Sequence, residues 1–354
     1  MDVRAASKPA PDQIPAFRRV LDTAKHGQPT EGFGWYPYDS LSSLEELLSL
    51  RPDRFAELFG SIQGRRILDV GCADGAMSFF LESLGFGVVA MDSPVFNFNQ
   101  MRGVQELKQR LGSQLEIRQV DLERDLLAAD EDFGLAVAMG LLYHLRNPIS
   151  FLQRLARCSS YCFLSTRVLA GDSTANAYLV DSTELGEDET NYWLFTASGM
   201  ERLLRRTGWD LEAYSLVTVG ADTRYFCWAK SRLKRPWIAL AGVHAPEEHG
   251  WSWTERRFRL RMTAPAVGFL ELHVVLPEAV LAALGPVGLK VAMPDGSKAA
   301  HQLERAGAHC LTLGPAAAGE CELEVLLDRA LAPSAADGRE LGLVLKDVRW
   351  VAAL

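Results

Sequence analysis

The residues best placed to do chemistry lie in a glycine-containing turn in the first third of the chain. The segment 65–81 reads RRILDVGCADGAMSFFL: an apolar run reaches Asp69, turns through Gly71 and Gly75, and continues as an amphipathic helix. Glycine is needed where the backbone approaches a ligand more closely than a Cβ allows. A second carboxylate, Asp92, ends the next apolar run, VVAMD, where it can accept hydrogen bonds from both hydroxyls of a ribose. This pattern predicts a nucleoside-binding turn.

The glycine spacing of this turn argues against a dinucleotide. The spacing GxGxxG sets a pyrophosphate on a helix N-terminus, whereas GCADG has the spacing GxxxG and carries an acid at Asp74. A carboxylate repels a diphosphate and attracts a cation. S-adenosylmethionine fits, because Asp69 and Asp74 would attract its positively charged amino and sulfonium groups. We therefore expect a cofactor with little negative charge at this turn.

The segment 61–230 resembles the class I S-adenosylmethionine-dependent methyltransferases. The run DVGCADG matches their first motif, with Ala73 where many members have a second glycine. Asp121 and Leu122, after the third strand, match the pair that holds the adenine, and Met139 opens the stretch at the mouth of the cofactor cleft. The resemblance implies these cofactor-binding residues: Asp69, Gly71, Cys72, Asp74, Gly75, Asp92, Asp121, Leu122 and Met139.

Candidate catalytic residues follow the fourth predicted strand, in the run YHLRNP at 143–148. A base near the methyl acceptor is useful for a hydroxyl, because it removes the proton as the oxygen attacks the methyl group. Histidine titrates in the right range, so His144 and its neighbour Tyr143 are the candidates. The alternative is that His144 closes the cleft by bonding to the backbone.

Aromatic residues in two loops are candidates for substrate contact. The run GFGWYPYDS at 32–40 supplies Trp35, Tyr36 and Tyr38, which could cap the site as a lid or simply pack as an amphipathic loop. Tyr192 and Trp193 follow a long polar loop at 171–190, and loops of that length are often functional.

Periodicity predicts the elements that position these residues. Short apolar runs alternate with amphipathic helices over 61–232, which is typical of a parallel sheet with helices on both faces. The last two runs are too close together for a parallel crossover, so the final strand should be antiparallel to its neighbour. The expected strands are 67–70, 88–91, 115–120, 135–139, 161–166, 209–217 and 223–229. We predict an α/β fold with the Rossmann-like seven-stranded sheet of the methyltransferases.

Two further domains flank this sheet. Residues 1–60 show helical periodicity and are predicted to form an N-terminal helical cap. From 236 to 354 strictly alternating runs predict an all-β sandwich domain, and 336–350 resembles the final strands of β-sandwich modules appended to bacterial polysaccharide enzymes. On one strand of this domain Arg257, Arg259 and Arg261 share a face, which is either solvated or available to an acidic ligand.

Composition restricts the class of protein. The 354 residues are 48% hydrophobic and 23% charged, no apolar run is long enough to span a membrane, and no signal peptide is evident, so we expect a cytoplasmic protein. The net charge of -8 argues against a broad nucleic-acid footprint, although a local basic groove stays open. Six scattered cysteines and the histidines show no metal-ligand spacing, so no metal site is predicted.

The resulting hypothesis is an S-adenosylmethionine-dependent methyltransferase that methylates an oxygen of a small molecule or glycan. The run YHLRNP and the segment NYWLFTASGMERLLRRTGW resemble the group related to tRNA wobble-uridine carboxymethyltransferases, so (carboxy)methyl transfer to that uridine is the alternative. From another class, the protein could be a cofactor-binding scaffold without turnover. The sequence leaves open the acceptor, the role of the β-domain and whether the chain forms a homodimer.

Overall fold

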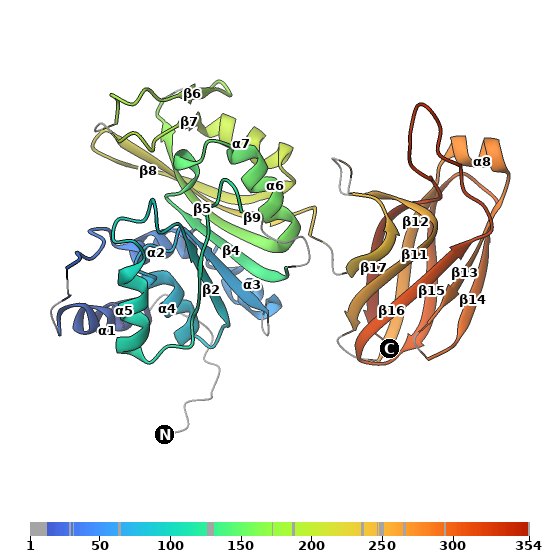
Figure 1. Cartoon of the computed structure of the whole chain (residues 1–354), viewed down its shortest axis with the longest axis horizontal. Helices are drawn as coiled ribbons and strands as arrows, with labels where there is room; N and C mark the ends of the chain where they lie inside the picture. Colours follow the sequence, from blue (N-terminus) through green and yellow to red (C-terminus); the bar gives the residue numbers. More distant parts are fainter. Residues whose placement is uncertain are drawn as a thin grey trace. The chain divides into compact units, whose positions relative to one another are not determined.

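The computed structural model divides the chain into two compact units, residues 1–234 and 235–354, which are described separately here (Figure 1). The described residues are 13–27, 30, 32–62, 65–125, 131–171, 173–185, 188–234, 237–245, 247, 251–264, 267–293 and 295–352. The first twelve residues of the predicted helical cap and His249 therefore lie outside the described residues. Within the described part, no helix combines the length and apolar character that a membrane span requires.

The first unit is built on a mixed sheet whose central strands are parallel. The order is β3-β2-β1-β4-β5, and β9 then pairs antiparallel with both β5 and β8. The bounds are β1 (Arg66–Val70), β2 (Val88–Asp92), β3 (Glu116–Gln119), β4 (Phe133–Met139), β5 (Ser159–Leu169), β8 (Trp209–Val219) and β9 (Asp222–Ser231). These seven strands confirm the predicted sheet, including its antiparallel final strand.

Two strands of this sheet were not predicted. The segment 171–190 was expected to be a loop, but β6 (Ala177–Leu179) pairs antiparallel with β7 (Trp193–Thr196), and β7 pairs parallel with the end of β5. The pairs are short, with Val168 opposite Phe195 and Leu169 opposite Thr196. A run of three or four residues shows too little alternation to be recognised from sequence. Through β7, this hairpin is attached to the end of β5.

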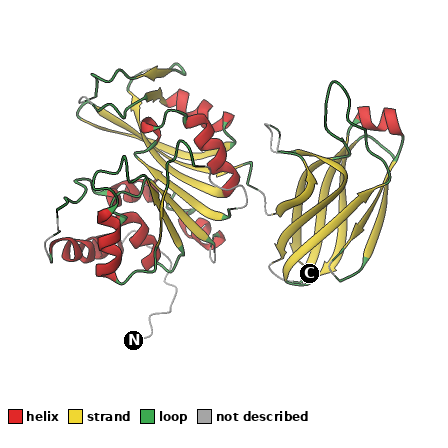
Figure 2. Cartoon of the chain, viewed as in Figure 1, coloured by secondary structure: helices red, strands yellow, loops and turns green. Residues whose placement is uncertain are grey.

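Helices cover both faces of the sheet (Figures 1 and 2). On one face a single hydrophobic cluster includes α1 (Ile14–His26), α2 (Ser40–Leu50), α3 (Phe55–Ser61), α4 (Ala76–Ser83) and α5 (Arg102–Leu111). On the other face α6 (Pro148–Cys158) and α7 (Ala197–Arg206) share a second cluster. The N-terminal helices therefore pack on the sheet itself, with Ile14, Leu44 and Leu47 almost fully buried.

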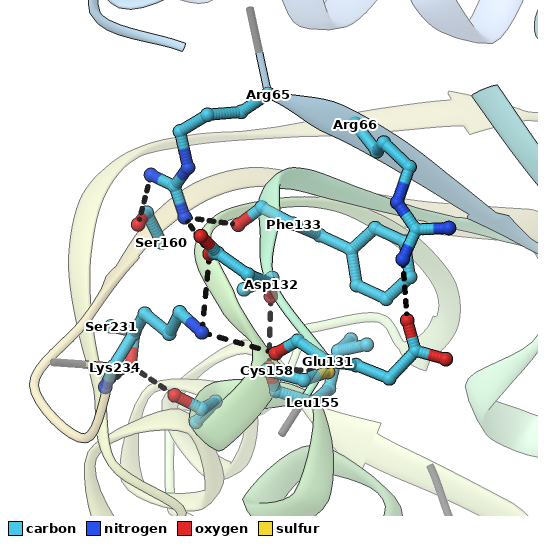
Figure 3. A network of polar contacts seen from close by, with 12 residues as sticks. Arg65, Arg66, Glu131, Asp132, Phe133, Leu155, Cys158, Ser160, Ser231 and Lys234 are labelled. Atoms are coloured by element: carbon cyan, nitrogen blue, oxygen red, sulfur yellow. Dashed lines mark hydrogen bonds and ion pairs between the residues drawn. The ribbon is translucent and has the colours of Figure 1, made fainter. Parts of the chain in front are cut away.

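A polar network at the amino ends of β1, β4 and β5 fixes the last residue of the first unit (Figure 3). The Lys234 ammonium donates to the Glu131 carbonyl at 3.1 Å and pairs with Asp132 at 3.2 Å. Arg65 also pairs with Asp132 and donates to the Phe133 carbonyl at 2.8 Å. The chain thus leaves the first unit at the amino edge of the sheet.

The second unit is an all-antiparallel β structure, as predicted. One set of strands runs β14-β13-β16-β11 with β10 beside β11, and the other runs β17-β12-β15. Alternate side chains from both sets share one hydrophobic cluster. The bounds are β10 (Trp237–Val243), β11 (Ser252–Ala264), β12 (Gly268–Leu276), β13 (Val287–Ala292), β14 (Lys298–Leu303), β15 (Gly307–Ala316), β16 (Gly319–Leu327) and β17 (Val344–Ala352), with one helix, α8 (Glu278–Leu284).

The row of arginines on β11 faces acidic residues on its neighbour. Arg257 pairs with Glu324, and Arg261 pairs with Glu322 at 2.7 Å across the β11–β16 register. Cross-strand pairs of opposite charge are common on the solvated face of a sheet. The pairing favours the solvated-face interpretation over an acidic ligand.

Candidate functional site

A cavity of about 930 Å³ opens at the carboxyl ends of the parallel strands of the first unit. Ligands of open α/β sheets bind in this position, outside the carboxyl ends of the strands. The volume lies toward the upper end of the range of about 300–1,000 Å³ that ligand sites span. The predicted site residues that line it are Asp69, Gly71, Cys72, Asp92, Asp121, Leu122, Met139, Tyr143, His144, Tyr36, Tyr38 and Tyr192.

The turn between β1 and α4 is held in place by the end of β2. The amides of Gly71 and Cys72 donate to the Met91 carbonyl at 2.8 and 3.1 Å. Gly71 has φ +75° and Ala73 has φ +53°, a region that strongly favours glycine. The alanine at the position of the expected second glycine therefore keeps the left-handed backbone of the turn.

Asp69 presents a buried carboxylate at the base of this turn. Its side chain is 3% exposed, and Ser78 Oγ donates to its Oδ2 at 2.5 Å. Burial raises the pKa of Asp69 to about 6, and the nearby charge of Asp92 adds to the rise. Among the described residues, only Ser78 donates hydrogen bonds to this buried carboxylate, so a cation in the cavity would stabilise its charged form.

Asp92 connects the turn to the loop that follows β2. Its Oδ2 accepts hydrogen bonds from the Ala73 amide at 3.0 Å and from Asn97 Nδ2 at 2.8 Å, while its Oδ1 accepts from the Ser93 amide at 2.8 Å. Burial also raises the pKa of Asp92. The carboxylate is therefore fixed in orientation at the cavity wall, where a ribose could reach it.

His144 also lines the cavity, and its hydrogen bonds define its tautomer. Its Nδ1 lies 3.2 Å from the Thr190 carbonyl oxygen and 2.9 Å from Thr190 Oγ1. A carbonyl can only accept, and Thr190 Oγ1 already donates to Asp188 at 2.6 Å, so Nδ1 carries the proton. Burial lowers the pKa of His144, which keeps the ring neutral at pH 7 with Nε2 as an acceptor.

Two arginines that the sequence analysis did not select line the cavity beside Tyr143. Arg167 on β5 lies opposite Arg224 on β9 in the strand register, and Asp222 pairs with both, at 3.1 and 3.2 Å. The Arg167 guanidinium lies 5.5 Å from the centre of the Tyr143 ring. Burial raises the pKa of Tyr143, so its hydroxyl stays protonated.

The aromatic candidates separate into two groups. Tyr36 accepts a hydrogen bond from the Phe98 amide at 2.7 Å, Tyr192 accepts one from Arg146 at 2.9 Å, and Tyr38 is 73% exposed at the rim. Trp35 and Trp193 do not line the cavity. Their indole nitrogens donate to the backbone carbonyls of Lys25 and Arg146, both at 3.2 Å, so each anchors a loop.

Asp74 and Gly75 also lie outside the cavity lining, in contrast to the predicted cofactor contacts. Asp74 is 3% exposed and pairs with Lys25 at 2.9 Å, which neutralises its charge. A Cβ on Gly75 would come within 2.7 Å of Val104, so this glycine permits close helix packing. The charge that faces a ligand at the turn therefore comes from Asp69 and Asp92.

Comparison with known proteins agrees with this geometry. Residues 41–214 match the family model described as a methyltransferase domain. The chain contains an S-adenosylmethionine-dependent methyltransferase domain. Its sheet has the antiparallel final strand that the sequence predicts.

Curated relatives of this chain are named for different transfer reactions. The chain is 30% identical over 155 residues to a tRNA U34 carboxymethyltransferase of Pseudomonas putida (strain GB-1), covering 42% of this chain and 47% of that protein. It is 28% identical over 137 residues to a ubiquinone biosynthesis O-methyltransferase of Bordetella avium (strain 197N), covering 37% and 55%. The chain thus spans about half the length of the curated relatives it matches.

Solved structures also match part of this chain. The N-terminal domain of EvdMO1, crystallised in the presence of SAH and D-fucose, is 18% identical, with a TM-score of 0.42. The match covers 61% of this chain and 97% of that one.

The ion pair between Lys25 and Asp74 is expected to stabilise the fold of the methyltransferase domain. Asp74 also accepts from the Tyr36 amide at 2.8 Å and Asn99 Nδ2 at 2.7 Å, so it joins α1, the aromatic loop and the loop after β2. We expect Lys25→Met to lower the free energy of unfolding by about 3 kcal/mol, because it leaves a buried carboxylate without its cation. Urea unfolding measures this change.

The matched control for this prediction is Lys230→Met, which removes an exposed ammonium from β9. Its free energy of unfolding should stay within about 0.5 kcal/mol of the wild-type value. Equal stability of the Lys25 and Lys230 variants would contradict the anchoring role.

Proposed function

We propose that the chain transfers a methyl group from S-adenosylmethionine to a hydroxyl oxygen of a small molecule or glycan. The observation that carries this proposal is the cavity itself, which is lined by two acidic residues, Asp69 and Asp92, and by a neutral histidine, His144. When bound, S-adenosylmethionine supplies a methyl group on a positively charged sulfur. The residues of the chain hold the two reactants in line, which can supply roughly 7–11 kcal/mol of the barrier reduction.

The residues at the turn fit this cofactor. Asp69 would attract its amino group, and Asp92 would accept from its ribose hydroxyls. Gly71 permits the positive φ of this turn, and a Cβ there would already meet the Leu141 side chain at 3.4 Å. Asp121 and Leu122, which line the same cavity, would flank the adenine.

His144 would act as the base at the acceptor end. Its Nε2 would take the hydroxyl proton as the acceptor oxygen gains the methyl group that S-adenosylmethionine gives up as S-adenosylhomocysteine. Thr190 is a positioning residue, because it holds Nδ1–H and so leaves Nε2 free of a proton. Asp188 in turn orients the Thr190 hydroxyl.

The raised pKa of Asp69 predicts a pH dependence of cofactor affinity. A cation beside Asp69 favours its ionised form, and the free protein ionises this group with a pKa of about 6. Affinity for S-adenosylmethionine should therefore be constant above pH 7 and fall below pH 6, by up to about tenfold per pH unit. Calorimetry from pH 5 to 8 measures this, and Asp69→Asn should flatten the profile. A flat wild-type profile would remove Asp69 from the cation site.

The direct test of the proposed function is an assay of S-adenosylhomocysteine formation with a panel of hydroxylated small molecules and glycans. We expect turnover with at least one acceptor, and the product spectrum should place the new methyl group on oxygen. A methyl group found only on nitrogen or carbon would overturn the proposal. Cofactor binding without product across the panel would instead favour a binding scaffold.

A second candidate is transfer of a carboxymethyl group to a wobble uridine of tRNA, which the names of several relatives suggest. Arg167 and Arg224 favour it, because guanidinium groups are preferred partners of carboxylates and phosphates. An acidic group on the acceptor of the first candidate would use the same arginines.

Variants of Arg224 distinguish these candidates. If the transferred group carries a carboxylate, Arg224→Gln should weaken turnover with a carboxylated analogue of S-adenosylmethionine by about tenfold or more, while turnover with the unmodified donor changes little. Filter binding of tRNA at two salt concentrations completes the test. Salt-insensitive or absent tRNA binding, with no use of the carboxylated donor, would rule out the second candidate.

A further inference from the structure

Three potential metal ligands meet on the outer face of the second unit, in the strand pair β12–β15. Glu271 and His273 are two residues apart on β12, so their side chains point to the same face of the sheet. Cys310 on β15 lies directly opposite His273 in the antiparallel register. Their neighbours Leu272 and Leu311 point into the core, which confirms that the three ligands face outward.

The ligand atoms are already close enough to share one ion. His273 Nε2 lies 3.0 Å from Glu271 Oε2 and 3.8 Å from Cys310 Sγ, and all three ligand atoms lie within 4.8 Å of one another. In a tetrahedral zinc site the ligand atoms lie about 3.3–3.6 Å apart, given metal–ligand distances of about 2.0–2.3 Å. Small side-chain rotations therefore suffice to form the site.

The surroundings leave these ligands available. Arg349 lies opposite Glu271 on β17, and its charge acts on Glu271 and Cys310, but its guanidinium donates its hydrogen bond to Asp347 at 2.8 Å. Cys310 is exposed, and Glu271 and His273 are half-buried, so an ion could enter from solvent. The sheet fixes the backbone of both strands, which reduces the cost of ordering the ligands.

We propose that Glu271, His273 and Cys310 bind a zinc ion, with water at the fourth position. Thiolate and imidazole ligands select zinc over magnesium and calcium, which prefer oxygen. Binding replaces the Cys310 thiol proton, which passes to solvent, by a zinc–sulfur bond. The His273 ring coordinates through Nε2 with its proton on Nδ1, and the hydrogen bond to Glu271 gives way to coordination of both residues.

The test is a titration of the full chain, first treated with a chelator, with zinc chloride and with magnesium chloride. We expect one equivalent of zinc to bind and magnesium to give no signal. Cys310→Ser and His273→Gln should each weaken zinc binding by about tenfold or more. His309→Gln is the matched control, because this neighbouring ring hydrogen-bonds to the Arg305 carbonyl at 2.8 Å and lies outside the cluster.

Cobalt substitution gives a second readout that does not depend on affinity. A thiolate–cobalt charge-transfer band should appear in the wild-type chain and in His309→Gln, and it should be absent from Cys310→Ser. Circular dichroism of each variant checks that the fold is intact. Absence of zinc binding, or equal binding by wild type and Cys310→Ser, would overturn the proposal.

Discussion

Replacement of Asp92 by alanine should weaken S-adenosylmethionine binding by about tenfold to a hundredfold, or about 1.4–2.7 kcal/mol. The variant loses the acceptor for the ribose hydroxyls, and these hydroxyls would be buried without a partner. It also loses the hydrogen bonds from the Ala73 amide and Asn97, which fix the turn. Isothermal titration calorimetry with S-adenosylmethionine and S-adenosylhomocysteine measures the effect.

A second variant separates the two roles of Asp92. Asn97→Ala removes a donor to the Asp92 carboxylate but leaves both carboxylate oxygens in place, so its loss of affinity should be severalfold at most. If Asn97→Ala weakened binding as much as Asp92→Ala, the effect would belong to the turn and not to the ribose. Unchanged affinity in Asp92→Ala would contradict the placement of the ribose.

Replacement of His144 by alanine should lower turnover by about 10²–10⁴-fold, the usual contribution of general base catalysis. The affinity for S-adenosylmethionine should change little, because His144 is not among the residues proposed to bind this cofactor. Wild-type turnover should rise with pH through the pKa of His144, which burial places below its ordinary value, and reach a plateau near neutral pH. Initial rates at saturating cofactor from pH 5 to 8 measure both effects.

Thr190→Val provides the comparison for His144. It removes one acceptor of Nδ1–H and keeps the backbone carbonyl, so turnover should fall less than in His144→Ala, by about tenfold. Full turnover in His144→Ala would remove the proposed base and leave proximity as the main source of catalysis.

The sheet was predictable because its strands carry strong local signals. Buried runs such as 67–70 and 135–139 alternate with amphipathic helices, and the short connection before β9 excludes a parallel crossover. The β6–β7 hairpin was missed because its strands are only three and four residues long, and β7 joins the end of β5 through just two residue pairs. Local periodicity cannot detect a short strand whose formation depends on pairing with another strand.

The candidate site was predictable where its residues lie at or just after the carboxyl ends of predicted strands, as Asp92, Asp121 and Met139 do. Asp69 lies one residue before the end of β1 and Asp92 ends β2, and these strands are parallel neighbours, which brings the two residues to the same edge of the sheet. Arg167 and Arg224 face one cavity because β5 and β9 pair in one particular register, and nothing in the sequence fixes that register. The proposed zinc ligands were missed for the same reason, since the register of β12 with β15 sets Cys310 opposite His273.

The partner of Asp74 could not be predicted from the sequence. Its residue type suited the predicted cation site, but its partner Lys25 comes from α1, a helix distant in sequence. Whether a carboxylate faces a cavity or an internal lysine depends on tertiary packing.

The central claim is that the acidic turn after β1 binds a positively charged nucleoside donor. Calorimetric titration of the full chain with S-adenosylmethionine, and separately with a nicotinamide dinucleotide, tests it most directly. We predict that S-adenosylmethionine binds with one site per chain and that the dinucleotide gives no heat and does not displace it. Binding of the dinucleotide at this turn, or no binding by either nucleoside, would contradict the account.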